Sequence, residues 1–372
     1  MNIPIFRSAV SAEGTVEAVI LALSDVLRSG SYVLGANVAA LEAALSQRLA
    51  AREVVAVNSG SDALKLALQA LGVGSAGGGR GDDEVILPSY TFAACMEAVL
   101  GAGAIPVLVD SQDNGFAPGI TAWQRARSPR TRAVLGVGLF GDARGTAELA
   151  DWCRQENVYL VEDIAQCFGA SDQGQAAGTW GDAAAMSFYP TKTLGAAGDA
   201  GAVAFRNPGH ARRARLLRNH GYDGQEHRES GHNSRMDELQ AAVLRIMLQR
   251  LPDDLQRRRW IASRYLQSLR TTGLTLPDVS EGHAWNYFVV LAGSGKERDR
   301  LALRLAAQGV ATRVYYPEPL HRHAPYIARF GVCHLPHSER LAQRSLALPL
   351  YPALTDDEIA HVIQAVQTAC VE

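Results

Sequence analysis

The sequence has few of the features that would place the protein outside the reducing, aqueous interior of a cell. Its five cysteines lie far apart, are odd in number and lack the paired spacing of a disulfide framework or a zinc site. The N-terminus has no basic segment followed by a long apolar core, and no apolar run is long enough to span a bilayer. We therefore expect a cytoplasmic protein that is neither exported nor membrane-bound.

A strong charge of one sign is also missing. The formal net charge is -2, and charged residues make up 20% of the 372 residues. A chain this close to neutral does not attract nucleic acid or an anionic membrane surface, so we expect neither as a partner. The arginines that recur at 212–218 and 257–259 are typical of solvated helix faces, with a diphosphate-binding role as the alternative.

Short apolar runs alternate with helical patterns through the first two thirds of the chain. Helices are predicted at 11–30 and 37–49. The runs predicted to be strands lie at 54–57, 84–87, 105–109, 133–137, 158–161, 183–188 and 202–205. Strands spaced by helices indicate an α/β fold with a mostly parallel seven-stranded sheet flanked by helices on both faces. In such sheets ligands bind at the carboxyl ends of the strands.

A smaller C-terminal α+β domain is predicted after the sheet. A long helical pattern from Met236 runs into Pro252, where we expect domain 1–251 to end and domain 252–372 to begin. The elements predicted in the second domain are a strand at 285–291, a helix at 298–308, a strand at 310–316 and a final helix. Thr355 and Glu358 form a capping-box pattern at the start of that last helix.

A lysine and an aspartate follow two of the predicted strands. Lys192 ends the run Ser187-Phe188-Tyr189-Pro190-Thr191-Lys192, and the run at 158–161 is followed by Glu162 and then Asp163. Pyridoxal phosphate (PLP) needs an amine for its aldehyde and a carboxylate for its ring nitrogen. Most lysines are only surface charges, and this aspartate could be only a helix cap. The small-residue loop at 195–201 favours a functional lysine, so the pattern predicts a PLP-dependent transaminase.

Further groups could complete such a cofactor site. The run at 58–64 joins a strand to a helix, so the Gly60 amide and the Ser61 hydroxyl would meet a phosphate at a helix N-terminus. The alternative is that these residues serve only as caps. Ser187 could add a second hydroxyl to the phosphate. Gln166 could bind the phenolic oxygen of the ring, and Phe92 could stack on its face.

Four motifs, in this order along the chain, resemble the DegT/DnrJ/StrS family of nucleotide-sugar aminotransferases. They lie at 58–64, 162–166, 187–192 and 233–242, and the similarity extends to 29–35 and 315–321. The resemblance implies a fold-type-I PLP-dependent transferase that forms a homodimer with shared active sites. It also implies amino transfer from L-glutamate to a nucleotide-linked keto-hexose, for lipopolysaccharide O-antigen, other surface polysaccharides or glycosylated metabolites.

The resemblance also implies roles for individual residues. Lys192 would form the imine with the cofactor and carry a proton, Asp163 would pair with the ring nitrogen, and Gln166 would pair with the phenolic oxygen. The implied phosphate contacts are Ser61, Asp62, Ser187 and, from the partner subunit, Asn233. The residues expected to face the sugar nucleotide are Arg235, Tyr316 and His321.

Two details of the motifs bear on the substrate and on the loop. The segments 188–190 and 217–221 are similar to the branch that makes 3-amino sugars, whereas the branch acting on carbon 4 more often has histidine where Tyr189 stands. We expect a 3-keto substrate, with a 4-keto substrate as the alternative. The run Gly198-Asp199-Ala200-Gly201 has a methyl group where the family usually has a second glycine. We expect only a local adjustment there.

Other classes of protein fit the sequence less well. Gly136-Val137-Gly138-Leu139-Phe140-Gly141 spells the dinucleotide fingerprint of an NAD-dependent oxidoreductase, with Glu162 about twenty residues on, but the next helix is predicted to start only near Thr146. A dehydratase of the same family would have histidine in place of Lys192, and a non-catalytic regulator would not need it. A metal site at Cys333, His334 and His337 lacks further ligands, so we expect no metal.

Overall fold

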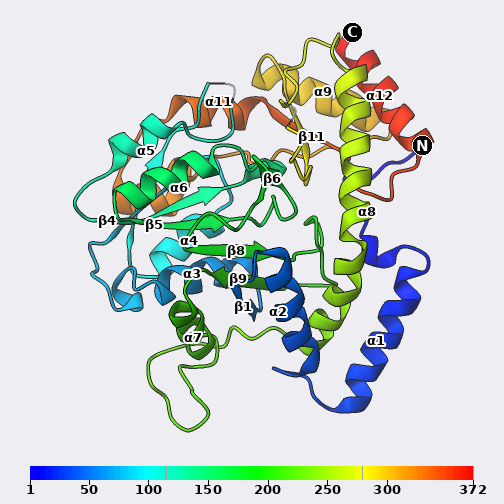
Figure 1. Cartoon of the computed structure of the whole chain (residues 1–372). Helices are drawn as coiled ribbons and strands as arrows, with labels where there is room; N and C mark the ends of the chain where they lie inside the picture. Colours follow the sequence, from blue (N-terminus) through cyan, green and yellow to red (C-terminus); the bar gives the residue numbers. More distant parts are fainter. Residues whose placement is uncertain (114, 279, 372) are drawn as a thin grey trace.

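A seven-stranded sheet forms the centre of the computed structural model, which describes residues 1–113, 115–278 and 280–371 (Figure 1). Across the sheet the strands are β1 (Glu53–Val57), β9 (Gly201–Phe205), β8 (Ala183–Ser187), β5 (Tyr159–Asp163), β4 (Thr131–Val137), β2 (Glu84–Pro88) and β3 (Ile105–Val109). Neighbours from β8 to β3 pair in parallel, and β9 is antiparallel to both β8 and β1. The predicted mostly parallel α/β sheet is confirmed.

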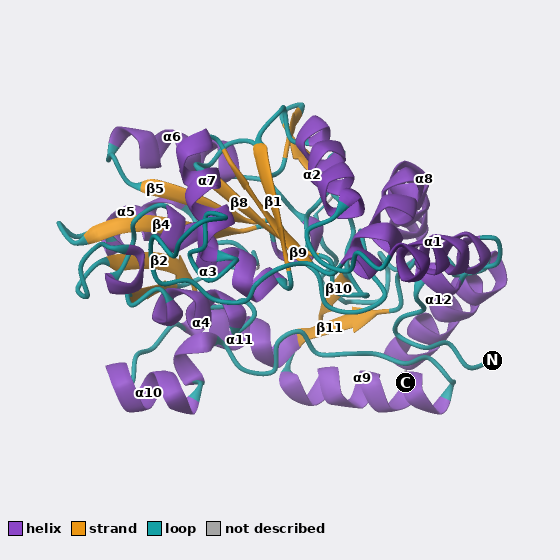
Figure 2. Cartoon of the chain, turned by 90° about the horizontal axis from the view of Figure 1, so that it is seen from below, coloured by secondary structure: helices purple, strands orange, loops and turns teal. Residues whose placement is uncertain are grey.

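Both faces of the sheet are buried, because alternate side chains of each strand enter two different cores. In β1, Val54 and Ala56 belong to one core, and Val55 and Val57 belong to the other. The helices over the first core are α1 (Thr15–Ser29), α2 (Ala36–Arg48), α5 (Ile120–Ala126), α6 (Thr146–Gln155) and the first part of α8 (Glu238–Ser268). Those over the second are α3 (Gly60–Ala70), α4 (Ala94–Gly101) and α7 (Pro208–Leu217). Figure 2 shows the strands between these two layers.

The C-terminal part of the chain has its own core. Its sheet pairs β10 (Phe288–Leu291) with β11 (Ser345–Leu348) in antiparallel fashion. Its helices are α9 (Gly295–Ala307), α10 (Ala324–Phe330), α11 (Pro336–Arg344) and α12 (Asp356–Val371). Ile3 also packs in this core, so both termini lie there (Figure 1). The capping box forms as predicted, because Glu358 Oε2 accepts from the Thr355 amide at 3.0 Å and Thr355 Oγ1 accepts from the Glu358 amide at 3.2 Å.

The strand predicted at 310–316 is wrong. This segment makes only two isolated bridges, Val310 with Ile3 and Arg313 with Ala347. Beyond them the chain leaves the C-terminal sheet, and the Tyr316 side chain reaches Gln166 at the edge of the central sheet. A tertiary contact therefore overrides the strand tendency of this apolar run.

Helix α8 continues through Pro252, where the sequence predicts a domain boundary. Its side chains up to Leu255 enter the first core, and those from Ile261 onward enter the C-terminal core. Proline cannot donate to the carbonyl four residues earlier. In this helix the Leu248 carbonyl accepts instead from Arg48 Nη2 at 3.2 Å. Neither α8 nor any other helix within the described ranges has the length and apolar character needed to cross a membrane.

We expect Arg48→Met to lower the free energy of unfolding by about 1 kcal/mol, because it leaves the Leu248 carbonyl without its donor. In a Pro252→Ala background the new backbone N–H can donate to that carbonyl, so Arg48→Met should cost less there. Urea unfolding of the four proteins of this double-mutant cycle measures both values. An equal cost in the two backgrounds would contradict the assigned compensation.

Candidate active site

The predicted catalytic residues meet at the carboxyl edge of the central sheet. Asp163 is the last residue of β5 and lies opposite Ala185 of the parallel strand β8. The chain that leaves β8 therefore carries Ser187 and then Lys192 past Asp163. Burial raises the pKa of Asp163, and the positive charge of Lys192 acts against that rise. This arrangement brings together an amine and a carboxylate from two neighbouring strands.

The Asp163 carboxylate is buried and has weak partners for a charged group. Its Oδ2 accepts from the Cys95 thiol at 3.2 Å, and its Oδ1 accepts from the Ala165 amide at 3.0 Å. Burial raises the pKa of Asp163, against the opposing effects of the amide, the thiol and Lys192. A cation placed against this carboxylate would compensate its burial, which fits the protonated nitrogen of a pyridine ring.

Cys95 is a site residue that the sequence did not reveal. It lies in α4, and burial raises the pKa of its thiol well above the ordinary value, so the thiol keeps its proton and can donate it to Asp163. The Thr91 hydroxyl lies 3.5 Å from the sulfur on the other side. The only signal in the sequence is that α4 begins just after Phe92, at the same edge of the sheet.

A tight turn presents Lys192 to this edge. The Lys192 amide donates to the Tyr189 carbonyl at 2.9 Å. A Cβ at Gly195 would lie 2.6 Å from the Pro190 carbonyl oxygen, so the turn closes only with glycine there. The Thr191 hydroxyl lies 3.0 Å from the Tyr287 hydroxyl, which ties the turn to the C-terminal part. Lys192 is half-buried, as a nucleophile at a cleft must be.

The N-terminus of α3 lies against Ser187, which is an arrangement suited to binding an anion. Ser59 caps the helix by accepting from the Asp62 amide at 3.2 Å. The first amides of a helix have no partner within it, and the Ser61 side chain here is exposed. A Cβ at Gly60 would lie 2.5 Å from the Ser187 Cβ, so glycine is needed for this approach. The predicted phosphate contacts Gly60, Ser61 and Ser187 are therefore adjacent.

Gly201, the glycine that the small-residue loop keeps, allows the close approach of that loop to the turn at Ser59. A Cβ at Gly201 would lie 2.4 Å from the Ser59 carbonyl oxygen, whereas the methyl group of Ala200 packs in the first core. The departure from the family pattern thus falls at a position with room for a side chain.

Asp62, Asn233 and Arg235 lie beside the anion site. The Asp62 carboxylate accepts from the Ser234 hydroxyl and pairs with Lys65 Nζ at 3.0 Å. Burial alone would raise the pKa of Asp62, but these two partners outweigh it and lower the pKa. Asp62 is thus bonded to Ser234, the residue after Asn233. The Asn233 side chain itself is exposed. Arg235 Nη1 donates to Asn219 Oδ1 at 2.7 Å. The contacts predicted from these three residues to phosphate and substrate stay predictions.

Gln166 and Tyr316 form the opposite wall of the site. Gln166 Oε1 accepts from the Phe140 amide at 2.9 Å, and its Nε2 donates to the Tyr316 hydroxyl at 2.8 Å. The second N–H of that amide group remains for a phenolic oxygen. The Phe92 ring lies 5.7 Å from that of Tyr316 and is 54% exposed, so its face is available for stacking. Tyr316 therefore lies beside Gln166 and Phe92, and its predicted contact with the substrate stays a prediction.

His321 lies inside the protein, in contrast to the expected contact with the sugar nucleotide. The residue is 0% exposed. Its Nδ1 lies 2.7 Å from Ser89 Oγ, and its Nε2 lies 3.0 Å from Glu339 Oε1. With both ring nitrogens engaged and no surface, the ring has nothing to offer a substrate.

The structure argues against the dinucleotide-binding alternative. The last three residues of the fingerprint, Leu139–Gly141, form a short 3-10 turn, and α6 begins only at Thr146 as predicted. The Glu162 carboxylate accepts from three backbone amides, those of Gly178, Trp180 and Gly181. Glu162 therefore organises the loop before β8 and is not available for a ribose.

Comparisons with known proteins agree with this geometry. Residues 15–367 match the DegT/DnrJ/EryC1/StrS aminotransferase family. The sequence is 37% identical, over 94% of this chain and 93% of the relative, to a UDP-N-acetyl-3-dehydro-alpha-D-glucosamine 3-aminotransferase of Acidithiobacillus ferrooxidans. The fold is similar to that of S. venezuelae DesV in complex with a ketimine intermediate, with a TM-score of 0.93, 36% identity and coverage of 100% and 99%.

Further comparisons bear on the cofactor and the substrate. The structure of NtdA from Bacillus subtilis contains bound PMP, with a TM-score of 0.91, 30% identity and coverage of 100% of this chain and 86% of that one. Among other curated relatives, four have names that specify carbon 3 of a sugar and one has a name that specifies carbon 4. Two more are named as regulatory proteins.

We expect Cys95→Val to weaken PLP binding about threefold to tenfold, because it removes a donor from the carboxylate that faces the ring nitrogen. Cys95→Ser is the matched control, since a hydroxyl can donate to the same oxygen. Titration of each apoprotein with PLP, followed by the visible absorbance of the bound cofactor, measures the difference. Equal dissociation constants for wild type and Cys95→Val would refute a role for the thiol.

Proposed function

This chain belongs to the DegT/DnrJ/EryC1/StrS aminotransferase family, and we propose that it moves an amino group from L-glutamate to carbon 3 of a nucleotide-linked keto-hexose. The chain is a PLP-dependent sugar aminotransferase of amino-sugar biosynthesis. One observation carries the proposal: the buried Asp163 ends a central strand, and Lys192 lies in the turn after the neighbouring parallel strand, beside the N-terminus of α3.

The residues of the site divide the chemistry among them. When bound, PLP supplies an aldehyde for the amines and a ring that accepts the electrons released at the reacting carbon. Lys192 Nζ would provide the amine that holds the aldehyde and would move a proton to and from the sugar carbon. The Asp163 carboxylate would hold the ring nitrogen in its protonated form. The free amides of α3 and the hydroxyls of Ser61 and Ser187 would hold the phosphate.

The lysine content of the chain supports this assignment. The sequence contains three lysines, Lys65, Lys192 and Lys296. Lys65 is paired with Asp62 at 3.0 Å, and Lys296 is exposed on α9 in the C-terminal part. Lys192 is therefore the amine that can reach a group held between Asp163 and α3. An intact set of Lys192, Asp163 and Gln166 also supports catalysis over a regulatory role.

Carbon 3 is favoured over carbon 4 by two observations. Tyr189, whose position more often carries histidine in the branch acting on carbon 4, is 50% exposed beside the Lys192 turn, where it can meet a substrate. The relatives named for carbon 3 outnumber the one named for carbon 4. We place the product in surface polysaccharides such as lipopolysaccharide O-antigen, or in glycosylated metabolites.

We infer that the enzyme acts as a homodimer in the cytoplasm. Helix α1 exposes Ile20, Leu21 and Leu27, each by more than half of its surface, and a second subunit would cover such a patch. The exposed Asn233 could then reach the phosphate of the partner's cofactor. The five cysteines are all free thiols, which suits a reducing compartment.

Borohydride treatment of the PLP-loaded enzyme should attach the cofactor to Lys192 alone, as peptide mapping by mass spectrometry will show. Lys192→Ala should lose at least about a thousandfold in turnover, because it removes both the nucleophile and the proton carrier. Lys296→Ala is the control and should keep wild-type turnover. A cofactor adduct on Lys65 or Lys296, or substantial turnover by Lys192→Ala, would disprove the assigned role.

A panel of nucleotide-linked 3-keto and 4-keto hexoses with L-glutamate will test the substrate. We expect kcat/KM for a 3-keto sugar to exceed that for the matching 4-keto sugar by about tenfold or more. Mass spectrometry of the amino sugar and release of 2-oxoglutarate report the reaction. Preference for the 4-keto isomer would reject carbon 3, and transfer from another amino acid only would reject glutamate.

A further inference from the structure

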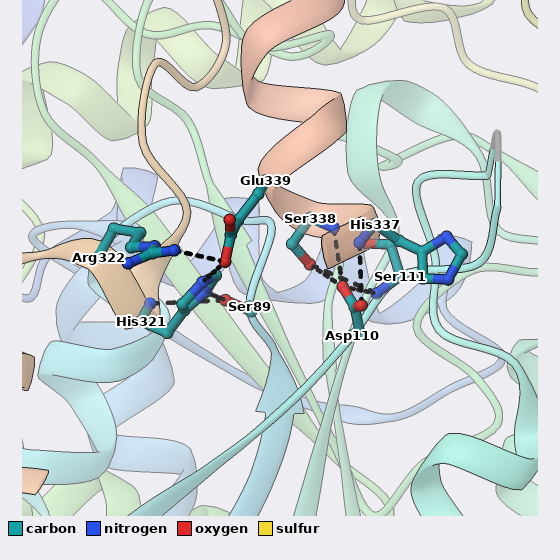
Figure 3. Close-up of polar contacts among 8 residues, drawn as sticks. All are labelled: Ser89, Asp110, Ser111, His321, Arg322, His337, Ser338 and Glu339. Carbon is teal, nitrogen blue, oxygen red and sulfur yellow. Dashed lines mark hydrogen bonds and ion pairs between the residues drawn. The ribbon is translucent and has the colours of Figure 1, made fainter. Parts of the chain in front are cut away.

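Helix α11 is docked onto the ends of two central strands by buried polar contacts (Figure 3). At the end of β3, Asp110 Oδ2 accepts from the His337 amide at 3.0 Å. Asp110 Oδ1 accepts from both the amide and the hydroxyl of Ser338 at 2.7 Å. A carboxylate at a helix N-terminus satisfies free amides and complements the helix dipole. Asp110 thus anchors the start of α11 to the central sheet.

The second contact runs through His321, which lies between Ser89 and Glu339 (Figure 3). Ser89 follows β2 directly, and Glu339 lies in the first turn of α11. Since a carboxylate only accepts, His321 Nε2 carries a proton and donates it to Glu339, while Nδ1 lies 2.7 Å from the Ser89 hydroxyl. Ser89 and His321 are both 0% exposed, and hydrogen bonds to both ring nitrogens compensate for the burial of the ring.

Glu339 is the partly exposed end of the hydrogen-bond chain Ser89–His321–Glu339, and its carboxylate is suited to accept from His321. It is partly exposed, and Arg322 Nη2 lies 2.9 Å from the same carboxylate oxygen. Burial alone would raise its pKa, but Arg322 and His321 lower the pKa of Glu339 to about 2. The carboxylate is therefore an ionised acceptor for His321 Nε2 at neutral pH.

Ser89, at the buried end of this chain of hydrogen bonds, belongs to the turn that continues to the proposed cofactor site. Its carbonyl accepts from the Leu320 amide at 2.8 Å, which joins the turn after β2 to the segment that begins at Tyr316. The next residue, Tyr90, is buried, and its hydroxyl accepts from the Tyr316 amide at 3.0 Å. Phe92, the stacking ring, is three residues after Ser89. The position of His321 is thus coupled to both Phe92 and Tyr316.

We propose that His321 is a positioning residue for the cofactor site and does not touch the substrate. Held between Ser89 and Glu339, it fixes the turn that carries Phe92 and the segment that carries Tyr316. Tyr316 in turn holds the amide of Gln166. The part of this proposal that concerns turnover depends on the proposed function, whereas the part that concerns cofactor binding does not.

The test compares Glu339→Ala, Glu339→Gln and His321→Leu, with His334→Gln as a control at an exposed histidine. The dissociation constant of PLP from each apoprotein titration is the first readout, and kcat and KM for the keto sugar are the second. Loss of one hydrogen bond should raise the PLP dissociation constant about fivefold in Glu339→Ala and lower kcat, with KM little changed. Glu339→Gln keeps an acceptor oxygen for His321 and should recover wild-type binding.

Three results would overturn the proposal. KM for the sugar could rise in His321→Leu or Glu339→Ala while PLP binding stays at the wild-type level, which would indicate substrate contact. PLP binding could stay unchanged in both His321→Leu and Glu339→Ala. Alternatively, PLP binding could fall in Glu339→Gln as much as it does in Glu339→Ala. If His321→Leu fails to fold, the partly exposed Glu339 variants decide. A wild-type enzyme that binds PLP but turns over no keto sugar would refute the proposed function and leave the PLP comparison valid.

Discussion

The main physical constraint on this structure is the buried carboxylate of Asp163, which needs a positive charge close to it. Asp163 ends a strand in the middle of the sheet, where an ionised group is costly unless it is paired. The protein offers it one amide, one thiol and the charge of a nearby lysine. The parallel strand β8 and the tight turn after it bring that lysine into place. A protonated ring nitrogen of bound PLP would supply the positive charge that this carboxylate needs.

The sheet and the placement of Asp163 and Lys192 at one edge could be predicted from the sequence because both have strong local signals. Strands covered on both faces are apolar throughout, so all seven could be found from short apolar runs. Parallel strands end at one edge, so Asp163 and Lys192 could be placed together before any coordinates. The anion site was visible for the same reason, because a glycine and serine turn joins a strand to a helix. Periodicity and strand order were sufficient for these features.

The features that were missed depend on contacts between distant segments. Cys95 and His321 carry no local mark of their partners, which lie 68 and 232 residues away in the sequence. The Leu248 carbonyl left without a donor by Pro252 is bonded by an arginine of another helix, so α8 continues through the proline. The run at 310–316 has the composition of a strand, but the hydrogen bond between Tyr316 and Gln166 places the end of this run away from the C-terminal sheet. Side-chain contacts of this kind depend on the three-dimensional fold, so they cannot be predicted from the spacing of residues along the sequence.

The unbroken course of α8 restricts how the molecule can move. A helix of 31 residues is about 46 Å long, and the two cores share it; Arg48 donates to the one carbonyl that Pro252 leaves without its backbone donor. Swinging one core against the other would require bending this rod and stretching its backbone hydrogen bonds. The two halves are therefore built to behave as one stiff frame. Entry of a bulky sugar nucleotide then depends on the short segments around the mouth of the cleft, which can shift without deforming the frame.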